Sequence, residues 1–80
     1  MTYLEELKKL KANFKRDKAT GNYISNFGEW SMEIEPDYDG GGIYYNIYKK
    51  GLWMEGDGGN GTTMRDCKIL WLYQIKEVIS

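Results

Sequence analysis

The chain has 80 residues, a formal net charge of −1, one cysteine and no histidine, so we expect a single domain, residues 1–80, without an internal disulfide. The absence of histidine removes the commonest metal ligand and general base, and the nearly balanced charge nominates no nucleic-acid or membrane partner. No apolar run approaches the ~20 residues that cross a bilayer, and the lysine-rich N-terminus lacks a signal peptide's apolar stretch. These features predict a cytoplasmic protein.

A capping box, formed by Thr2 and Glu5, predicts that an amphipathic helix begins the chain. Its apolar stripe runs from Tyr3 to Phe14 at helical spacing, and the helix is expected to end before Gly21. Acidic residues occupy the first turn and basic residues follow, which agrees with the helix dipole. We interpret the lysine-rich outer face as a solvated surface, with a phosphate or acidic-partner contact as the alternative. Residues 22–28 are expected to form a connector.

Three strands are expected next, as an antiparallel meander over residues 29–35, 43–49 and 52–55. Residues 29–35 alternate between apolar and acidic or polar side chains, which is typical of a half-buried strand. Two aromatic and β-branched runs that meet at Lys50 and Gly51 predict a tight hairpin. The expected cross-strand pairs are Lys49 with Leu52, Tyr48 with Trp53, Ile47 with Met54 and Asn46 with Glu55.

This register places the apolar side chains of the sheet on one face, because side chains alternate along a strand. We expect that face to be the core: Trp30, Met32, Ile34, Ile43, Tyr45, Ile47, Leu52 and Met54. The other face of the hairpin is expected to carry Tyr44, Asn46, Tyr48, Trp53 and Glu55.

The C-terminal part of the chain predicts a glycine-rich turn and a second helix. Four glycines in residues 56–61 indicate a mobile turn, and Thr63 followed by Asp66 is typical of a helix start. Apolar residues then recur at three or four over residues 64–79, although alternation between Ile69 and Ile75 leaves a fourth strand as the alternative. The predicted fold class is α+β, in the order α-β-β-β-α, with both helices on one face of a three-stranded meander.

Several motifs that resemble catalytic or ligand sites have simpler explanations. The glycines at 56, 58 and 61 match G-x-G-x-x-G, but the chain lacks the parallel βαβ context of a dinucleotide site. Oxygen ligands in the two glycine-rich loops lack EF-hand spacing. Cys67 falls on the apolar helix face without a histidine partner, so a buried, inert thiol is expected. We therefore predict a protein that is not an enzyme, with no catalytic residue, cofactor or metal.

Tyr44, Tyr48 and Trp53 are the candidate site residues, together with Asp37 and Asp39 of the acidic loop. Aromatic side chains are enriched in protein-binding hot spots, and they also stack nucleobases on sheet surfaces. Carboxylates can occupy an Arg/Lys-lined site of a target protein that otherwise takes phosphate. The alternative is that Phe27, Tyr23 or a loop folds over the aromatics and makes them a second small core.

The element order is similar to that of the double-stranded-RNA-binding domain, and one hexad carries the likeness. Residues 63–68, Thr-Met-Arg-Asp-Cys-Lys, resemble in place that family's S-K-K-x-A-K at the start of its second helix, with Met64 at the first lysine position. The resemblance implies nucleic-acid binding through basic residues of both helices, including Arg65 and Lys68. The loop that enters a minor groove in that family is here the acidic segment from Pro36 to Asp39, and carboxylates oppose a polyanion.

In size, acidic loops and helix-meander-helix order, the chain also resembles small phage-encoded inhibitors such as anti-CRISPR proteins. Our functional hypothesis from the sequence is therefore a non-enzymatic binding module, an inhibitor from a phage or mobile element, that docks on a host protein. A nucleic-acid-binding domain is the alternative. Self-association is a further option, because a meander leaves edge strands.

Overall fold

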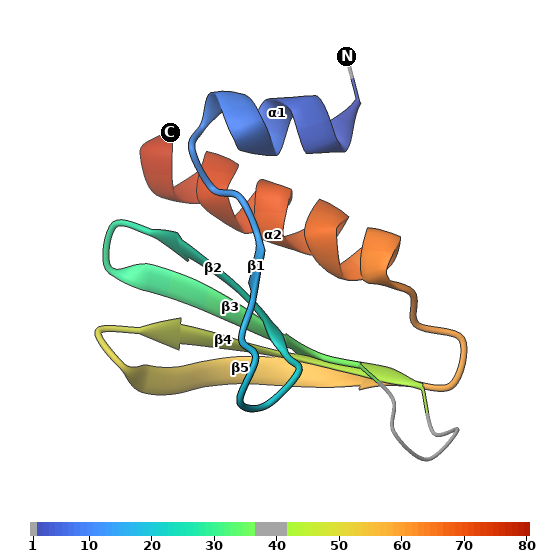
Figure 1. Cartoon of the computed structure of the whole chain (residues 1–80). Coiled ribbons are helices and arrows are strands. Elements are labelled where there is room, and N and C mark those ends of the chain that lie inside the picture. Colours follow the sequence, from blue (N-terminus) through green and yellow to red (C-terminus); the bar gives the residue numbers. More distant parts are fainter. Residues whose placement is uncertain (1, 37–41) are drawn as a thin grey trace.

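Over residues 2–36 and 42–80, which it describes, the computed structural model has two helices and five strands (Figure 1). In chain order the elements are α1 (Tyr3–Lys9), β1 (Lys15–Arg16), β2 (Tyr23–Phe27), β3 (Trp30–Glu35), β4 (Ile43–Lys49), β5 (Leu52–Gly59) and α2 (Met64–Ile79). The expected α+β class with two helices and an antiparallel meander is confirmed. The expected number of three strands is wrong, because β1 and β2 extend the sheet.

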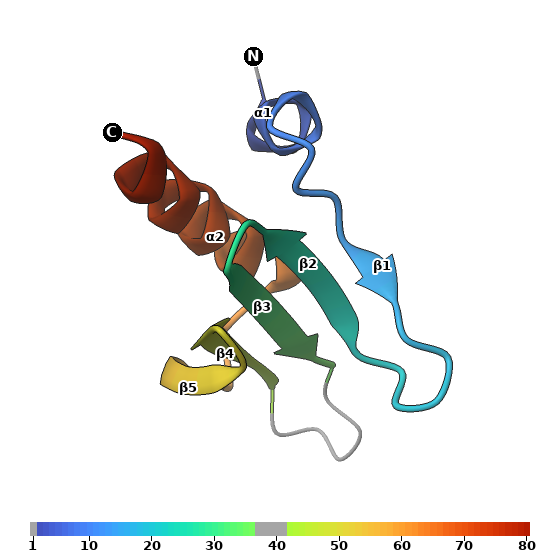
Figure 2. The ribbon, with the colours of Figure 1, turned by 90° about the vertical axis from the view of Figure 1, so that its left-hand side faces the viewer.

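The strands pair in the order β1-β2-β3-β4-β5, and each neighbouring pair is antiparallel. Both helices lie on the same side of this sheet (Figures 1 and 2). Helix α2 runs across the strands, and α1 packs against α2 from the far side. One face of the sheet is therefore covered by helices.

The core lies between the sheet and the helices. Its buried apolar members come from both helices, the segment after α1, and the central strands: Leu7, Ala12, Met32, Ile34, Ile47, Cys67, Trp71, Leu72 and Ile75. Trp30, Ile43 and Tyr45 pack against this cluster as partly buried residues, as the alternation of β3 and β4 predicted.

Helix α1 ends much earlier than expected. The capping box is present, with the Thr2 side chain accepting from the Glu5 N–H, but the last helical residue is Lys9. Lys11 then takes a positive φ of 62°, and the Ala12 N–H donates to the Leu7 carbonyl at 2.8 Å. The chain turns there, buries Ala12, and brings Phe14 to the core from an extended segment rather than from the helix.

The expected connector at residues 22–28 contains strand β2. Tyr23, Ser25 and Phe27 point to the helix side, where they pair in register with Ile34, Met32 and Trp30 of β3. The turn between the strands is Gly28-Glu29, and Gly28 has φ of 60°, which suits the first position of a two-residue type II′ turn.

The turn predicted at Lys50 and Gly51, which joins β4 and β5, is confirmed. The cross-strand pairs predicted beyond Tyr48 and Trp53 are wrong. Lys50 and Gly51 have φ of 53° and 80°, the two positive values of a type I′ turn, and Tyr48 pairs with Trp53. A bulge follows, so Ile47 pairs with Glu55 rather than with Met54. The extra residue turns the Glu55 side chain to the helix side.

Two expected core residues lie outside the core, and the bulge accounts for one of them. Met54 is the extra residue in β5 and is 49% exposed, while Leu52 lies near the turn and is 71% exposed. Strand β5 has no buried residue along its whole length, in contrast to β3 and β4.

The glycine-rich segment also differs from the expectation of a mobile turn. Residues 56–59 continue β5, and Gly58 pairs with Tyr44. A Cβ atom at Gly58 would collide with the Ile43 carbonyl and the Tyr44 Cα, so glycine permits this close pairing. After the turn, α2 begins with a capping box in which the Asp66 N–H donates to the Thr63 hydroxyl at 3.1 Å, and the expected second helix is confirmed.

Candidate functional site

The face of the sheet that points away from both helices, which we call the open face, carries the candidate site. Strand alternation and register define its members, since their neighbours along each strand point into the core. They are Lys15, Ile24, Asn26, Ser31, Glu33, Glu35, Tyr44, Asn46, Tyr48 and Trp53.

The structure places the three predicted aromatic residues on this open face. Tyr44 is 45% exposed and Trp53 is 60% exposed, whereas Tyr48 is half-buried. Asp37 and Asp39, the other two predicted site residues, lie outside the described residues. The described part of the candidate site therefore consists of aromatic side chains on β4 and β5 together with carboxylates of β3.

Glu33 joins Tyr48 into a polar cluster at the centre of the open face. The Asn22 side-chain amide donates to the Glu33 carboxylate at 3.1 Å, and this carboxylate is close enough to the Tyr48 phenol to influence its ionisation. Burial raises the pKa of Tyr48, and the negative charges of Glu33 and Glu35 raise it further. Tyr48 is thus a neutral hydrogen-bond donor at physiological pH.

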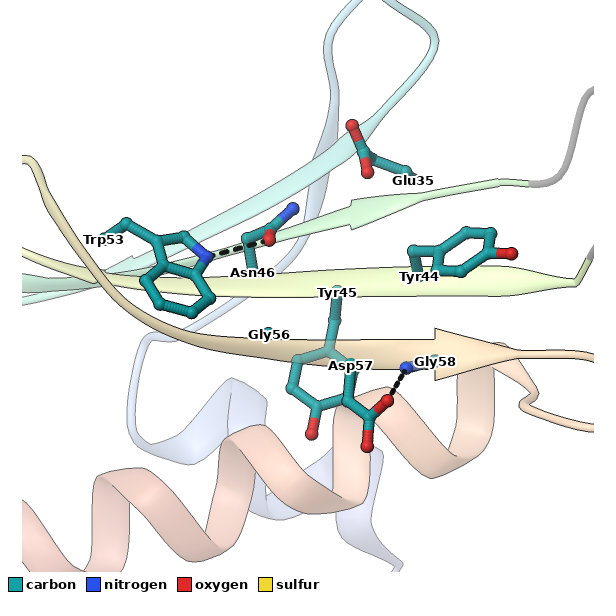
Figure 3. A pocket seen from close by; sticks show the side chains of 8 residues that line it. All are labelled: Glu35, Tyr44, Tyr45, Asn46, Trp53, Gly56, Asp57 and Gly58. Atoms are coloured by element: carbon teal, nitrogen blue, oxygen red, sulfur yellow. Dashed lines mark hydrogen bonds between the residues drawn. The ribbon is translucent and has the colours of Figure 1, made fainter.

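A groove of about 260 Å³ lies beside this cluster, between Trp53 and Tyr44 (Figure 3). Glu35, Asn46, Gly56 and Gly58 complete its lining on the open face, while the side chains of Tyr45 and Asp57 point toward the helices. The Trp53 indole N–H donates to the Asn46 Oδ1 at 3.0 Å, which holds the indole ring across the strands.

Glycine makes this groove possible. Beyond Trp53, the β5 positions that face the open side are Gly56 and Gly58, so no side chain fills the space between the two aromatic rings. A Cβ at Gly56 would lie 2.5 Å from the Asn46 Oδ1 and 3.3 Å from the Trp53 Nε1. The indole therefore lies against the bare backbone of Gly56 and forms a wall of the groove.

The apolar surface continues onto the edge of the sheet. Leu52, Trp53 and Met54 are three consecutive exposed apolar residues, and within the described chain β5 is the last strand on its side of the sheet. Leu52 and Trp53 point to opposite faces of β5, so exposed apolar side chains flank both sides of this edge strand, which is typical of an interaction surface.

Charge divides the molecule between the two ends of the sheet. A hollow of about 320 Å³ at the β1 end is lined by Lys11, Asn13, Lys15, Ile24 and Asn26. On the helix side, the Arg65 guanidinium lies 5.8 Å from the centre of the Tyr3 ring, and the Lys68 Nζ lies 5.8 Å from that of Phe14. The β1 end is thus basic and β3 and β5 carry carboxylates, whereas both helices carry charges of either sign.

The described residues offer little for nucleophilic or metal chemistry. Cys67 is fully buried, and burial raises the pKa of its thiol to about 11, so the reactive thiolate is scarce at neutral pH. Within residues 2–36 and 42–80, no three cysteine or carboxylate side chains converge in a way that would hold a metal ion. In the same part of the chain, neither helix combines the length and the apolar character needed to span a bilayer.

Comparisons with protein-family models, with curated proteins and with solved structures found no match to this chain. The site must therefore be interpreted from its own geometry. Sequence reasoning identified the aromatic residues and missed the groove. The available signal was the period-two spacing of Gly56 and Gly58, which leaves one face of an extended strand without side chains.

Proposed function

We propose that this chain is a non-enzymatic protein-binding module that uses its open face to dock on a basic surface of a target protein. The observation that carries the proposal is the pairing of exposed aromatic residues, Tyr44 and Trp53, with carboxylates on the same face. Aromatic side chains supply buried contact area at low entropic cost. The carboxylates of Glu33 and Glu35 select a partner of opposite charge.

An inhibitory role is part of the same proposal. A face that combines carboxylates with aromatic rings can occupy an Arg/Lys-lined site that otherwise takes phosphate groups. Asp37 and Asp39 belong to this proposal on the basis of the sequence alone, since they lie two and four residues after Glu35. Reversal of both charges to lysine should weaken target binding, and full retention of affinity would remove the loop from the binding surface.

A selection from a random displayed-peptide library tests the proposal and requires no named target. Three immobilised proteins are compared: the wild type, an open-face variant with Tyr44→Ser and Trp53→Ser, and a matched variant with Leu70→Ser and Tyr73→Ser. The last pair is also exposed and apolar, but lies on α2. Circular dichroism melting establishes that all three proteins are folded.

The proposal predicts that the wild type and the α2 variant enrich the same basic peptides, and that the open-face variant does not. Binding of those peptides should weaken with salt, because charge pairing contributes to it. If no peptide is enriched, or if the open-face variant enriches the same peptides, the open face is not a protein-binding surface.

Nucleic-acid binding is the second candidate, favoured by the basic side chains that α1 and α2 bring together. Lys8 and Lys68 line a common hollow with Phe14, and Arg65 lies close to Tyr3. This candidate predicts that labelled double-stranded RNA binds the protein, that affinity falls steeply between low and physiological salt, and that Lys68→Glu abolishes binding. If Lys68→Glu leaves RNA affinity unchanged, the helix surface around Lys68 is not the RNA-binding site.

A further inference from the structure

We propose that the groove between Trp53 and Tyr44 binds the guanidinium group of an arginine side chain that the partner presents. This inference rests on the proposed protein-binding function and names the residue that the open face recognises. It follows from three properties of the groove, which are its aromatic walls, its glycine floor and its carboxylate.

The walls suit a planar cation. Trp53 and Tyr44 stand on either side of the groove, on the same side of the sheet (Figure 3). A guanidinium group stacks on aromatic faces, with tryptophan the strongest partner in cation–π contacts. The hydrogen bond from the Trp53 indole to Asn46 fixes the orientation of the larger wall before a ligand arrives. Such preorganisation lowers the entropic cost of binding.

The floor and the size suit one side chain. Gly56 and Gly58 line the groove without contributing a side chain to it, so the space between the two rings stays open. At about 260 Å³ the groove lies below the ~300–1,000 Å³ typical of small-molecule sites. A long side chain can therefore enter between the rings while the rest of the partner rests on the exposed apolar residues around Trp53.

The charge favours arginine over a neutral or anionic group. Glu35 lines the groove, and Glu33 lies on the same face one alternation earlier in β3. A carboxylate beside aromatic rings matches a guanidinium, whose fork can donate two hydrogen bonds to the carboxylate while its plane stacks on a ring. Lysine offers a point charge without this geometry, so it should bind the groove less tightly than arginine.

Three capped tripeptides test the inference: Gly-Arg-Gly, Gly-Lys-Gly and Gly-citrulline-Gly. Citrulline keeps the shape of arginine and lacks its charge. The readout is the indole Nε1–H peak of Trp53 in ¹⁵N–¹H spectra, with the peaks of Trp30 and Trp71 as internal references. We expect the arginine peptide to shift the Trp53 peak, with affinity at least about threefold above lysine and tenfold above citrulline.

Two variants with the same change of charge separate the groove from general electrostatics. Glu35→Gln should weaken the arginine peptide at least about fivefold. Glu29 lies in the β2–β3 turn, with its Oε1 3.8 Å from the Lys50 Nζ. Glu29→Gln should leave the affinity for the arginine peptide unchanged. Equal binding of arginine and citrulline, unaltered affinity in Glu35→Gln, or a Trp53 peak that no peptide moves would overturn the arginine assignment.

The two proposals fail in distinguishable ways. If library peptides bind through the open face but the arginine tripeptide does not enter the groove, the arginine inference is wrong and the protein-binding function stands. If the arginine tripeptide binds but no library peptide depends on Tyr44 and Trp53, the groove assignment stands and the docking function is wrong.

Discussion

The indole N–H of Trp71 donates a hydrogen bond of 2.9 Å to the hydroxyl of Ser25, across the interface between α2 and β2. The Ser25 hydroxyl in turn donates to the Ala12 carbonyl at 2.8 Å. All three residues are buried. One small polar side chain thus satisfies a donor on the helix and an acceptor in the segment after α1, and it connects three parts of the chain.

Ser25→Ala should lower the free energy of unfolding by about 1–3 kcal/mol, because the indole and the carbonyl lose their shared partner in a buried site. Urea denaturation followed by circular dichroism measures the change. The matched control is Ser31→Ala on the open face of β3, for which we expect a change within about 0.5 kcal/mol. Equal effects of the two substitutions would contradict the structural role of Ser25.

Gly56→Ala should both destabilise the protein and close the groove. The added Cβ would lie 2.8 Å from the Tyr45 carbonyl, which is backbone and cannot turn aside, and 2.5 Å from the Asn46 Oδ1. We expect a loss of about 1–3 kcal/mol in urea denaturation, as for other overpacked sites. Glu55→Ala, an exposed change in the same strand, should cost much less. Unaltered stability of Gly56→Ala would contradict the close pairing of β5 with β4.

The Cys67 thiol should resist small disulfide reagents in the folded protein. With its pKa raised from 9.0 to about 11, the thiolate fraction at pH 8 falls about 100-fold, and burial adds a steric barrier. The reaction rate is compared at pH 8 with and without denaturant. A folded protein that reacts within about tenfold of the denatured chain would contradict a buried thiol.

The same thiol should make the free energy of unfolding fall as the pH rises into the alkaline range. Below pH 9.0 the thiol is protonated in both states, so its full contribution is present. As pH rises toward about 11, the unfolded chain releases this proton first, and the folded state loses stability. The free energy of unfolding should therefore fall more steeply over this range in the wild type than in Cys67→Ala. Parallel curves would refute this linkage.

Glu33→Gln should lower the pKa of Tyr48 while leaving it above its ordinary value of 10.0. Burial is the largest cause of the raised pKa and persists in the variant, whereas the negative charge of Glu33 is removed. The titration of the Tyr48 ring carbon by NMR measures the change, with Glu29→Gln as the control. An identical Tyr48 titration in both variants would show that Glu33 does not interact with the phenol.

Local patterns predicted much of the fold, since both capping boxes and the Lys50-Gly51 turn depend on residues close in sequence. Strand β2 was not predicted, because its central residue on the core side is Ser25, a polar residue that interrupts the apolar alternation. The partners that satisfy its hydroxyl, Ala12 and Trp71, lie 13 and 46 residues away in the sequence. No local pattern records such contacts.

The candidate site was predictable only in part, for a similar reason. Alternation in β4 correctly placed Tyr44 and Tyr48 on one face. In β5, Leu52, Trp53 and Met54 are all apolar, so the pattern does not show which of them is the extra residue of the bulge. That single shift moved Glu55 to the helix side. The glycines after it were interpreted as turn residues, which concealed the groove that they form.

The most direct test of the open face as a docking surface is a ¹⁵N–¹H map of chemical-shift changes as the tightest basic peptide from the library is added. We expect the changes to concentrate at Tyr44, Asn46, the Trp53 indole, Gly56 and Gly58, with α1 and α2 little affected. Changes confined to the helices around Lys8 and Lys68 would contradict the account and identify the opposite side of the molecule as the binding surface.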